Sequence, residues 1–134
     1  MLITYGHLNT SDLRGMTQAD YLISIDADLR ILDGARCVFE EPSFPVLELA
    51  RSLSQWLSEP NRSDVAFESM SYEEVGAVTV RATQGGWIFG SVFEPSASSP
   101  VGWDEAERCV RSFVAQVSAD LHALKLDPDQ VIGL

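Results

Sequence analysis

The sequence predicts one α+β domain, in which a mostly antiparallel sheet of four to six strands carries two amphipathic helices on one face, in the order ββαβββα. Short segments alternate apolar and polar side chains, two longer segments repeat apolar side chains every three or four residues, and Gly or Pro marks the junctions. The 134 residues suit one domain, so we assign residues 1–134 to a single unit. An apolar share of 46% is enough for a core without disulfides or a metal.

The first hairpin is predicted over residues 21–41. Apolar side chains alternate with polar ones from Tyr21 to Leu32, which is typical of a strand with one buried face. The turn Asp33-Gly34 follows, and Ala35–Glu41 returns as the second strand. The polar side of this hairpin implies that the second face of the sheet meets water or a partner.

The register of this hairpin follows from its turn. A three-residue loop with Gly34 in the left-handed region would pair Leu29 with Cys37 and Ala27 with Phe39. This pairing places both Cys37 and Phe39 on the apolar face, so we expect the bulged turn.

Two helices are predicted from apolar stripes. The first begins at Pro45, whose missing N–H costs nothing in a first helical turn, and ends at Glu59-Pro60-Asn61. The second runs from about Trp103 to Leu124. Their stripes are Val46, Leu49, Ala50, Leu53, Trp56 and Leu57, and Ala106, Val110, Phe113, Val114, Val117, Leu121 and Leu124.

The remaining strands are shorter. Val65–Tyr72, Ala77–Thr83 and Trp87–Glu94 have strand character, with Gly85-Gly86 as the turn of the last hairpin. A sixth strand is possible at Leu2–Leu8.

The charge balance limits the possible partners. Twenty acidic residues against nine basic ones give a net charge of −11, which disfavours binding to nucleic acid or to anionic lipid. The same charge suits either solubility alone or docking onto a basic protein. The first residues do not form a signal peptide and no apolar stretch reaches membrane-spanning length, so we expect no membrane partner and a cytoplasmic location.

No set of residues predicts catalysis, a metal site or a cofactor. The sequence contains no nucleophile elbow, phosphate-binding loop or zinc-protease motif, so we expect a protein that is not an enzyme. Cys37 and Cys109 are each expected on an apolar face as small core residues. An enzymatic role would require a cleft that joins Cys37 or a carboxylate to His7 or His122.

One acidic stretch is the best candidate for partner binding. It contains Asp64, Glu68, Glu73 and Glu74, with Tyr72 among them as an aromatic anchor. A second acidic set, formed by Asp26, Asp28 and Glu40, would share the outer face of the first hairpin. Both sets are also compatible with simple solvation.

The aromatic side chain of Trp87, just after the Gly-Gly turn, is a second possible anchor for a partner.

A set of segments follows in order along the chain: Ala27–Ile31, Asp33-Gly34, Glu40–Pro42, Phe44–Val46, Glu48–Ala50, Trp56-Leu57, Phe67–Ser71, Gly86-Trp87 and Gly90–Glu94. In these segments the chain resembles a family of short acidic bacterial proteins of unknown function, found mostly in GC-rich genomes. The resemblance spans roughly residues 20–126 and implies no catalytic residues. Eight of the nine basic residues are Arg, which agrees with a GC-rich genome. At the level of class, the chain also resembles immunity proteins of bacterial toxin systems.

These observations favour a cytoplasmic protein-binding domain of the immunity or antitoxin type, which neutralises a basic partner protein such as a toxin domain through its acidic surface. The alternative is a small-molecule-binding or accessory protein with a pocket between sheet and helices. Formation of a homodimer through the first or last strand edge is compatible with both.

Overall fold

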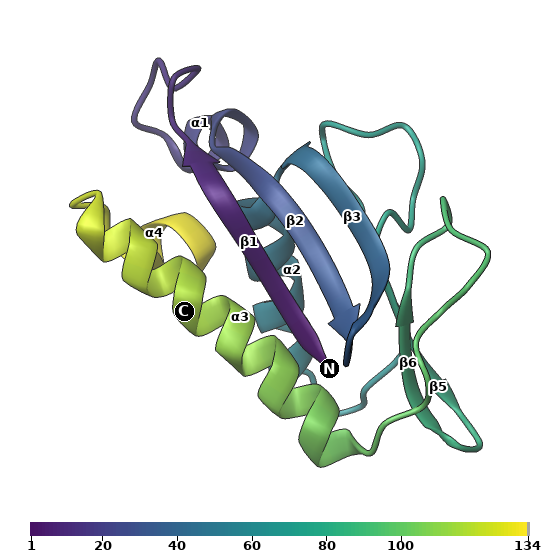
Figure 1. Cartoon of the computed structure of the whole chain (residues 1–134). Helices are drawn as coiled ribbons and strands as arrows, with labels where there is room; N and C mark the ends of the chain where they lie inside the picture. Colours follow the sequence, from purple (N-terminus) through teal and green to yellow (C-terminus); the bar gives the residue numbers. More distant parts are fainter. Residues whose placement is uncertain (134) are drawn as a thin grey trace.

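The computed structural model describes residues 1–133 and contains two three-stranded antiparallel sheets and four helices (Figure 1). In chain order the elements are β1 (Leu2–Asn9), α1 (Gln18–Ser24), β2 (Asp26–Asp33), β3 (Arg36–Phe44), α2 (Val46–Ser58), β4 (Val65–Ala66), β5 (Thr79–Thr83), β6 (Gly86–Gly90), α3 (Trp103–Ala123) and α4 (Pro128–Ile132). The α+β class is confirmed. The single sheet, the two helices and the order ββαβββα match only loosely, because the strands divide between two sheets and two short helices are added.

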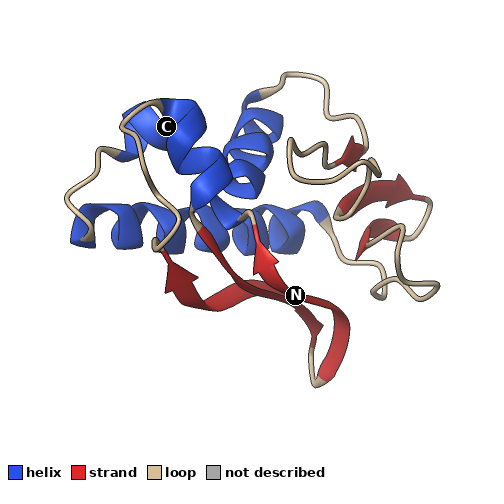
Figure 2. Ribbon diagram, turned by 90° about the horizontal axis from the view of Figure 1, so that it is seen from above, coloured by secondary structure: helices blue, strands red, loops and turns tan. Residues whose placement is uncertain are grey.

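The first sheet has the order β1-β2-β3, and the helices gather on one of its faces (Figure 2). Its inner face is buried, whereas the outer face carries the polar side chains, as the alternation predicts. The predicted N-terminal strand is confirmed as β1. Helix α3 lies along the free edge of β1, where the Gln116 amide donates to the carbonyl of Tyr5 at 3.3 Å and the Tyr5 hydroxyl donates to Asp120 at 2.5 Å. The buried side chains of this sheet are Ile3, Tyr5, Ala27, Leu29, Ile31, Val38, Phe39 and Phe44.

The start of the first predicted strand is wrong, because residues 18–24 form helix α1. Thr17 and Asp20 form a reciprocal capping box, in which the Thr17 side chain accepts from the Asp20 N–H and the Asp20 carboxylate accepts from the Thr17 N–H. These bonds satisfy otherwise unpaired N–H groups of the first turn and favour a helix. Strand β2 therefore begins only at Asp26.

The predicted register of the first hairpin is also wrong. Gly34 is left-handed as predicted, with φ of +61°, but the strands pair Leu32 with Cys37, Ile31 with Phe39 and Ala27 with Phe44. Strand β3 carries a bulge opposite the step from Ile31 to Leu32, whereas the prediction had placed the bulge in the turn itself. It puts Phe39 in the core but leaves Cys37 exposed, so only Cys109 is a buried cysteine.

Helices α2 and α3 confirm the two predicted helices. The apolar stripe of α2 is buried from Val46 to Trp56, with Pro45 just outside as the N-cap residue, and α3 buries its stripe from Ala106 to Leu121. Helix α4 was not expected. It begins with Pro128 after an Asp127 cap and places Val131 and Ile132 in the core.

The second sheet has the order β4-β5-β6 and is smaller than predicted. The expected strand Val65–Tyr72 pairs with β5 only at Val65 and Ala66, after which the chain turns away into a loop. The outer edge of β6 is bonded by the segment that follows it, since Trp87 and Val101 exchange two backbone hydrogen bonds of 2.7 and 2.9 Å.

Two cysteines in different environments give a direct test of the corrected register. Burial raises the pKa of the Cys109 thiol to about 11, whereas Cys37 is exposed. Because the thiolate is the reactive form, a thiol reagent at pH 8 is expected to modify one cysteine per native chain and two in denaturant. A Cys37→Ser variant is expected to show no native reaction; protection of Cys37 in the native wild-type chain would contradict the register.

The last hairpin gives a test with a matched control. Gly86 has φ of +130°, and a Cβ there would lie 2.5 Å from the carbonyl oxygen of Val101, whereas a Cβ at Gly85 would meet Pro100 and Thr83 at ordinary van der Waals distances. Gly86→Ala is therefore expected to lower the free energy of unfolding by about 2–3 kcal/mol, and Gly85→Ala by much less. Urea denaturation of both variants measures this difference, and equal stabilities would show that the segment carrying Val101 does not lie against the hairpin.

Candidate protein-binding surface

The predicted partner-binding residues lie at two places on the second sheet. Glu68, Tyr72, Glu73 and Glu74 belong to the loop that follows β4. Asp64 and Trp87 lie toward the opposite end: Asp64 accepts a 2.9 Å hydrogen bond from the N–H of Ala82, which pairs with Trp87. The structure therefore brings four of the six residues together and separates the other two from them.

Trp87 belongs to a cluster of three tryptophans that connects the second sheet to the helices. Its ring packs against those of Trp56 on α2 and Trp103 on α3, with centroid distances of 5.4 and 5.5 Å. The guanidinium of Arg62 covers the ring of Trp103 at 3.8 Å. Trp87 is thus half-buried and has a packing role in the fold.

The loop after β4 is held by a carboxylate from helix α2. Glu48, in the first turn of α2, accepts from the Ser69 hydroxyl at 2.6 Å and from the N–H of Met70 at 3.2 Å. Ser69 in turn accepts from the N–H of Ser71 at 2.9 Å. These bonds order the segment that carries Met70 and Tyr72.

A second loop, residues 91–94, lies beside the first. The N–H of Val92 donates to the carbonyl of Gly76 at 2.9 Å, and the Tyr72 and Phe93 rings lie 6.3 Å apart. Together the loops expose large apolar side chains, since Met70 is 61% exposed and Phe93 48% exposed. We call this surface the loop patch; it comprises Met70, Tyr72, Val75, Val92 and Phe93 with the bordering carboxylates Glu68, Glu73, Glu74 and Glu94.

All charged residues of the loop patch are acidic. The sequence has no Lys or Arg between Arg62 and Arg81 or between Arg81 and Arg108. Burial raises the pKa of the Tyr72 hydroxyl, and the nearby charge of Glu41 on β3 raises it further. The loop patch therefore combines an apolar centre with an acidic rim, which is typical of a protein interface with a basic partner.

The outer face of the first sheet holds a separate hollow with a His–Asp pair. Nδ1 of His7 lies 2.9 Å from Oδ2 of Asp28, which meets the geometric condition set above for an enzymatic role. His7 is 87% exposed, however, and electrostatic catalysis depends on groups held in a water-excluded site. Cys37 pairs with Leu32 near the turn, away from this pair, and His122 lies exposed in the last turn of α3.

Comparison with protein families assigns the chain to a group without a known activity. A family model described as a domain of unknown function, DUF7878, matches residues 1–123. The chain belongs to this family. No curated protein and no solved structure matches it.

The match covers every element of this DUF7878 domain that forms the loop patch and the outer hollow. Among the described residues, no group of three or more potential ligands is placed to hold a metal ion. Within residues 1–133, no helix has both the length and the apolar character needed to cross a bilayer.

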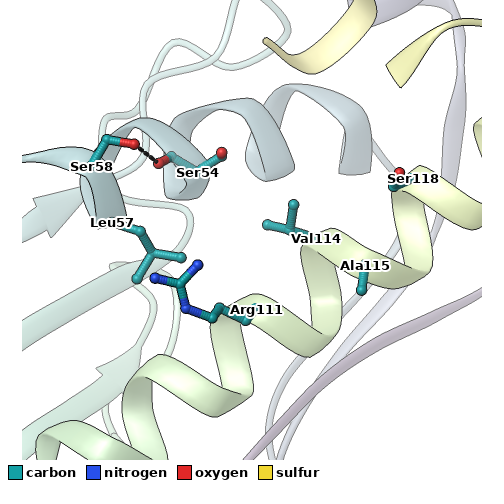
Figure 3. A pocket seen from close by; sticks show the side chains of 7 residues that line it. All are labelled: Ser54, Leu57, Ser58, Arg111, Val114, Ala115 and Ser118. Atoms are coloured by element: carbon teal, nitrogen blue, oxygen red, sulfur yellow. Dashed lines mark hydrogen bonds between the residues drawn. The ribbon is translucent and has the colours of Figure 1, made fainter. Parts of the chain in front are cut away.

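A groove between α2 and α3 is a further concave feature of the DUF7878 domain (Figure 3). It has a volume of about 380 Å³ and is open to solvent. Serines line much of it, with Leu57 and Val114 between them, and the Arg111 guanidinium there is bonded to Glu107 at 3.0 Å. Its lining residues are Ser54, Leu57, Ser58, Arg111, Val114, Ala115 and Ser118.

The Glu48 contacts predict which change will loosen the loop patch. Glu48→Ala removes both acceptors, so the amides of Met70 and Ser71 are expected to exchange with deuterium about tenfold faster, while most of the fold is unaffected. Glu59→Ala, at the exposed end of the same helix, is the control and should leave these amides unchanged. Unaltered exchange in Glu48→Ala would mean that the loop is ordered by its apolar contacts alone.

Proposed function

We propose that this domain is a cytoplasmic protein-binding module of bacterial origin, of the immunity or antitoxin kind, which neutralises a basic partner protein through the loop patch. The supporting observation is the exposure of Met70 and Phe93 in a loop pair whose charged residues are all carboxylates. An exposed apolar patch with a polar rim is the usual mark of a protein interaction site.

The two parts of the loop patch have different roles in this proposal. Burial of Phe93 and Met70 against the partner supplies affinity and slows dissociation, as aromatic anchors do at interface centres. The carboxylates of the rim attract a basic partner over a distance and raise the association rate, an effect that salt reduces. A toxin domain with a basic active site, such as a nuclease, is the partner class that fits.

Asp64 and Trp87 belong to this proposal only as a second contact area, because they lie at the other end of the sheet. Self-association through the first or last strand competes with contacts within the chain. The edge of β1 is bonded by α3, and the edge of β6 is bonded by Val101.

A small-molecule-binding role is the second candidate, and the groove between α2 and α3 is the observation that favours it. Its serine hydroxyls and Arg111 offer polar contacts beside Leu57 and Val114. A ligand that binds only the folded state raises the melting temperature in a saturable way, so a thermal-shift screen tests this role. Loss of the stabilisation in Ser54→Trp, which fills the groove, would locate the site there.

The test of the leading proposal begins with a pull-down from bacterial lysate at low and high salt, followed by affinity measurement with the identified protein. Glu68→Gln/Glu73→Gln/Glu74→Gln is expected to weaken binding ten- to a hundredfold at low salt and less at high salt. Phe93→Ala is expected to raise the dissociation rate at least tenfold.

The charge control is Asp12→Asn/Glu59→Gln/Asp104→Asn, which makes the same change in net charge at exposed positions outside the loop patch. It should retain affinity within about threefold, since only long-range attraction is reduced. An equal loss of affinity in the Glu68/Glu73/Glu74 variant and in the control variant would show that net charge acts without a defined site. Unchanged affinity in both the Glu68/Glu73/Glu74 variant and Phe93→Ala would place the interface elsewhere.

A further inference from the structure

Strand β3 carries a second bulge close to its end. Leu29 of β2 pairs with Glu41. Ala27, two positions earlier on β2, pairs with Phe44, which lies three positions later on β3, so β3 has one residue more than β2 opposite Asp28. Because side chains alternate between the two faces of a strand, the extra residue decides which face Phe44 occupies. It turns the Phe44 ring to the inner face, where the ring is fully buried.

Strand β1 has a bulge at the same level of the sheet. Gly6 pairs with Asp28. The next pair joins Asn9 to Asp26, so β1 also has one residue more than β2. This bulge contains His7, whose side chain is exposed on the outer face. The position of Asp28 on the central strand is therefore flanked by a bulge on each neighbouring strand.

Each bulge contains a residue in the left-handed region of backbone conformation. The φ angles are +55° for His7 and +54° for Ser43. Glycine takes such angles without cost, whereas a residue with a Cβ is strained there and stays so only where the surrounding structure holds it. Of the three non-glycine residues with positive φ in the described chain, two therefore lie in the bulges beside Asp28.

The carboxylate of Asp28 contacts both strained residues. Its Oδ1 accepts from the N–H of Ser43 at 3.2 Å, and its Oδ2 lies 2.9 Å from Nδ1 of His7. Each oxygen thus meets a different bulge. The residue after Ser43 is Phe44, whose ring packs against Tyr72 of the loop patch with centroids 5.7 Å apart. Contacts therefore run without a gap from the outer face of the first sheet to the loop patch.

We propose that Asp28 is a positioning residue for the loop patch, an inference that rests on the proposed function. Its carboxylate holds Ser43 in the β3 bulge, the bulge turns Phe44 inward, and the Phe44 ring supports Tyr72. The contact with His7 fixes the orientation of the carboxylate. The partner would touch only the loop patch, and Asp28 would set the fraction of molecules in which that surface is ready to bind.

Hydrogen exchange tests this inference without the partner. The amides of Tyr72 and Gly76 donate to carbonyls of their own loop at 3.4 and 2.9 Å, so their exchange reports the order of the loop patch. Asp28→Ala removes both contacts of the carboxylate and is expected to speed exchange at these two amides about tenfold. Asp28→Asn keeps an acceptor oxygen for the N–H of Ser43 and is expected to change it less than about threefold.

Two further variants separate positioning from a general loss of stability. Thr17→Ala removes the cap of α1, touches neither bulge, and should leave the exchange of Tyr72 unchanged. Ser43→Gly takes the left-handed conformation without strain, so the β3 bulge no longer depends on the carboxylate. Asp28→Ala/Ser43→Gly is therefore expected to exchange the Tyr72 amide within about threefold of Ser43→Gly alone.

With the partner protein, Asp28→Ala is expected to raise the Kd at least threefold, and the added Ser43→Gly to restore most of the affinity. The inference is overturned if Asp28→Ala leaves Tyr72 exchange unchanged or changes it no more than Thr17→Ala does. It is also overturned if Asp28→Ala does not fold and Ser43→Gly fails to rescue it.

The partner measurement distinguishes the failure of this inference from the failure of the proposed function. Binding that is weakened by Phe93→Ala but unaffected by Asp28→Ala would overturn the role of Asp28 and leave the proposed function standing. Faster exchange in Asp28→Ala, together with partner binding that is unaffected by both loop patch variants, would refute the proposed function, while the hold of Asp28 on the loop would stand.

Discussion

Phe44 is the side chain at which the first sheet meets the segment that follows β4 and the loop patch. It ends β3, is fully buried, and packs against Phe39 of its own strand at 6.2 Å, Phe67 beyond β4 at 5.7 Å and Tyr72 of the loop patch at 5.7 Å. Edge and tilted aromatic contacts of this kind add specific geometry to the burial of large apolar surface. Because β4 has only two residues, the position of the loop after it depends on this aromatic contact and on the bonds to Glu48.

The two long helices were predicted well because their apolar residues recur every three or four positions. In a strand these residues would fall on both faces, so only a helix buries them together. It failed at residues 21–24, where an alternating apolar pattern is also compatible with a short helix, and the cap of Thr17 and Asp20 decides between them. The predicted register of the first hairpin was wrong for a different reason. A bulge of one residue depends on packing across the sheet, and the local pattern around Gly34 does not encode it.

About half of the loop patch could be predicted from the sequence. The carboxylates Glu68, Glu73 and Glu74 and the ring of Tyr72 fall on the loop patch, although the segment was expected to be a strand. Met70 and Phe93 were missed because apolar residues inside a predicted strand are assigned to the core. Met70 is exposed because the chain leaves the sheet after Ala66 and is held there by Glu48, and Phe93 is exposed because β6 already ends at Gly90. The charge of Glu41 on β3 acts on the Tyr72 hydroxyl in the loop after β4, and no local sequence pattern predicts this proximity.

The proposed function gives the position of the negative charge a role that solubility alone would not require. Charge spread over the whole surface would serve that purpose equally well. Here the carboxylates without basic neighbours along the chain border the exposed Met70 and Phe93. The same segment is ordered by the bonds of Ser69 and Met70 to Glu48. A surface that is already ordered loses less conformational entropy when it binds, so more of the contact energy appears as affinity. This combination of exposure, charge and prior order distinguishes the loop patch from the other acidic parts of the surface.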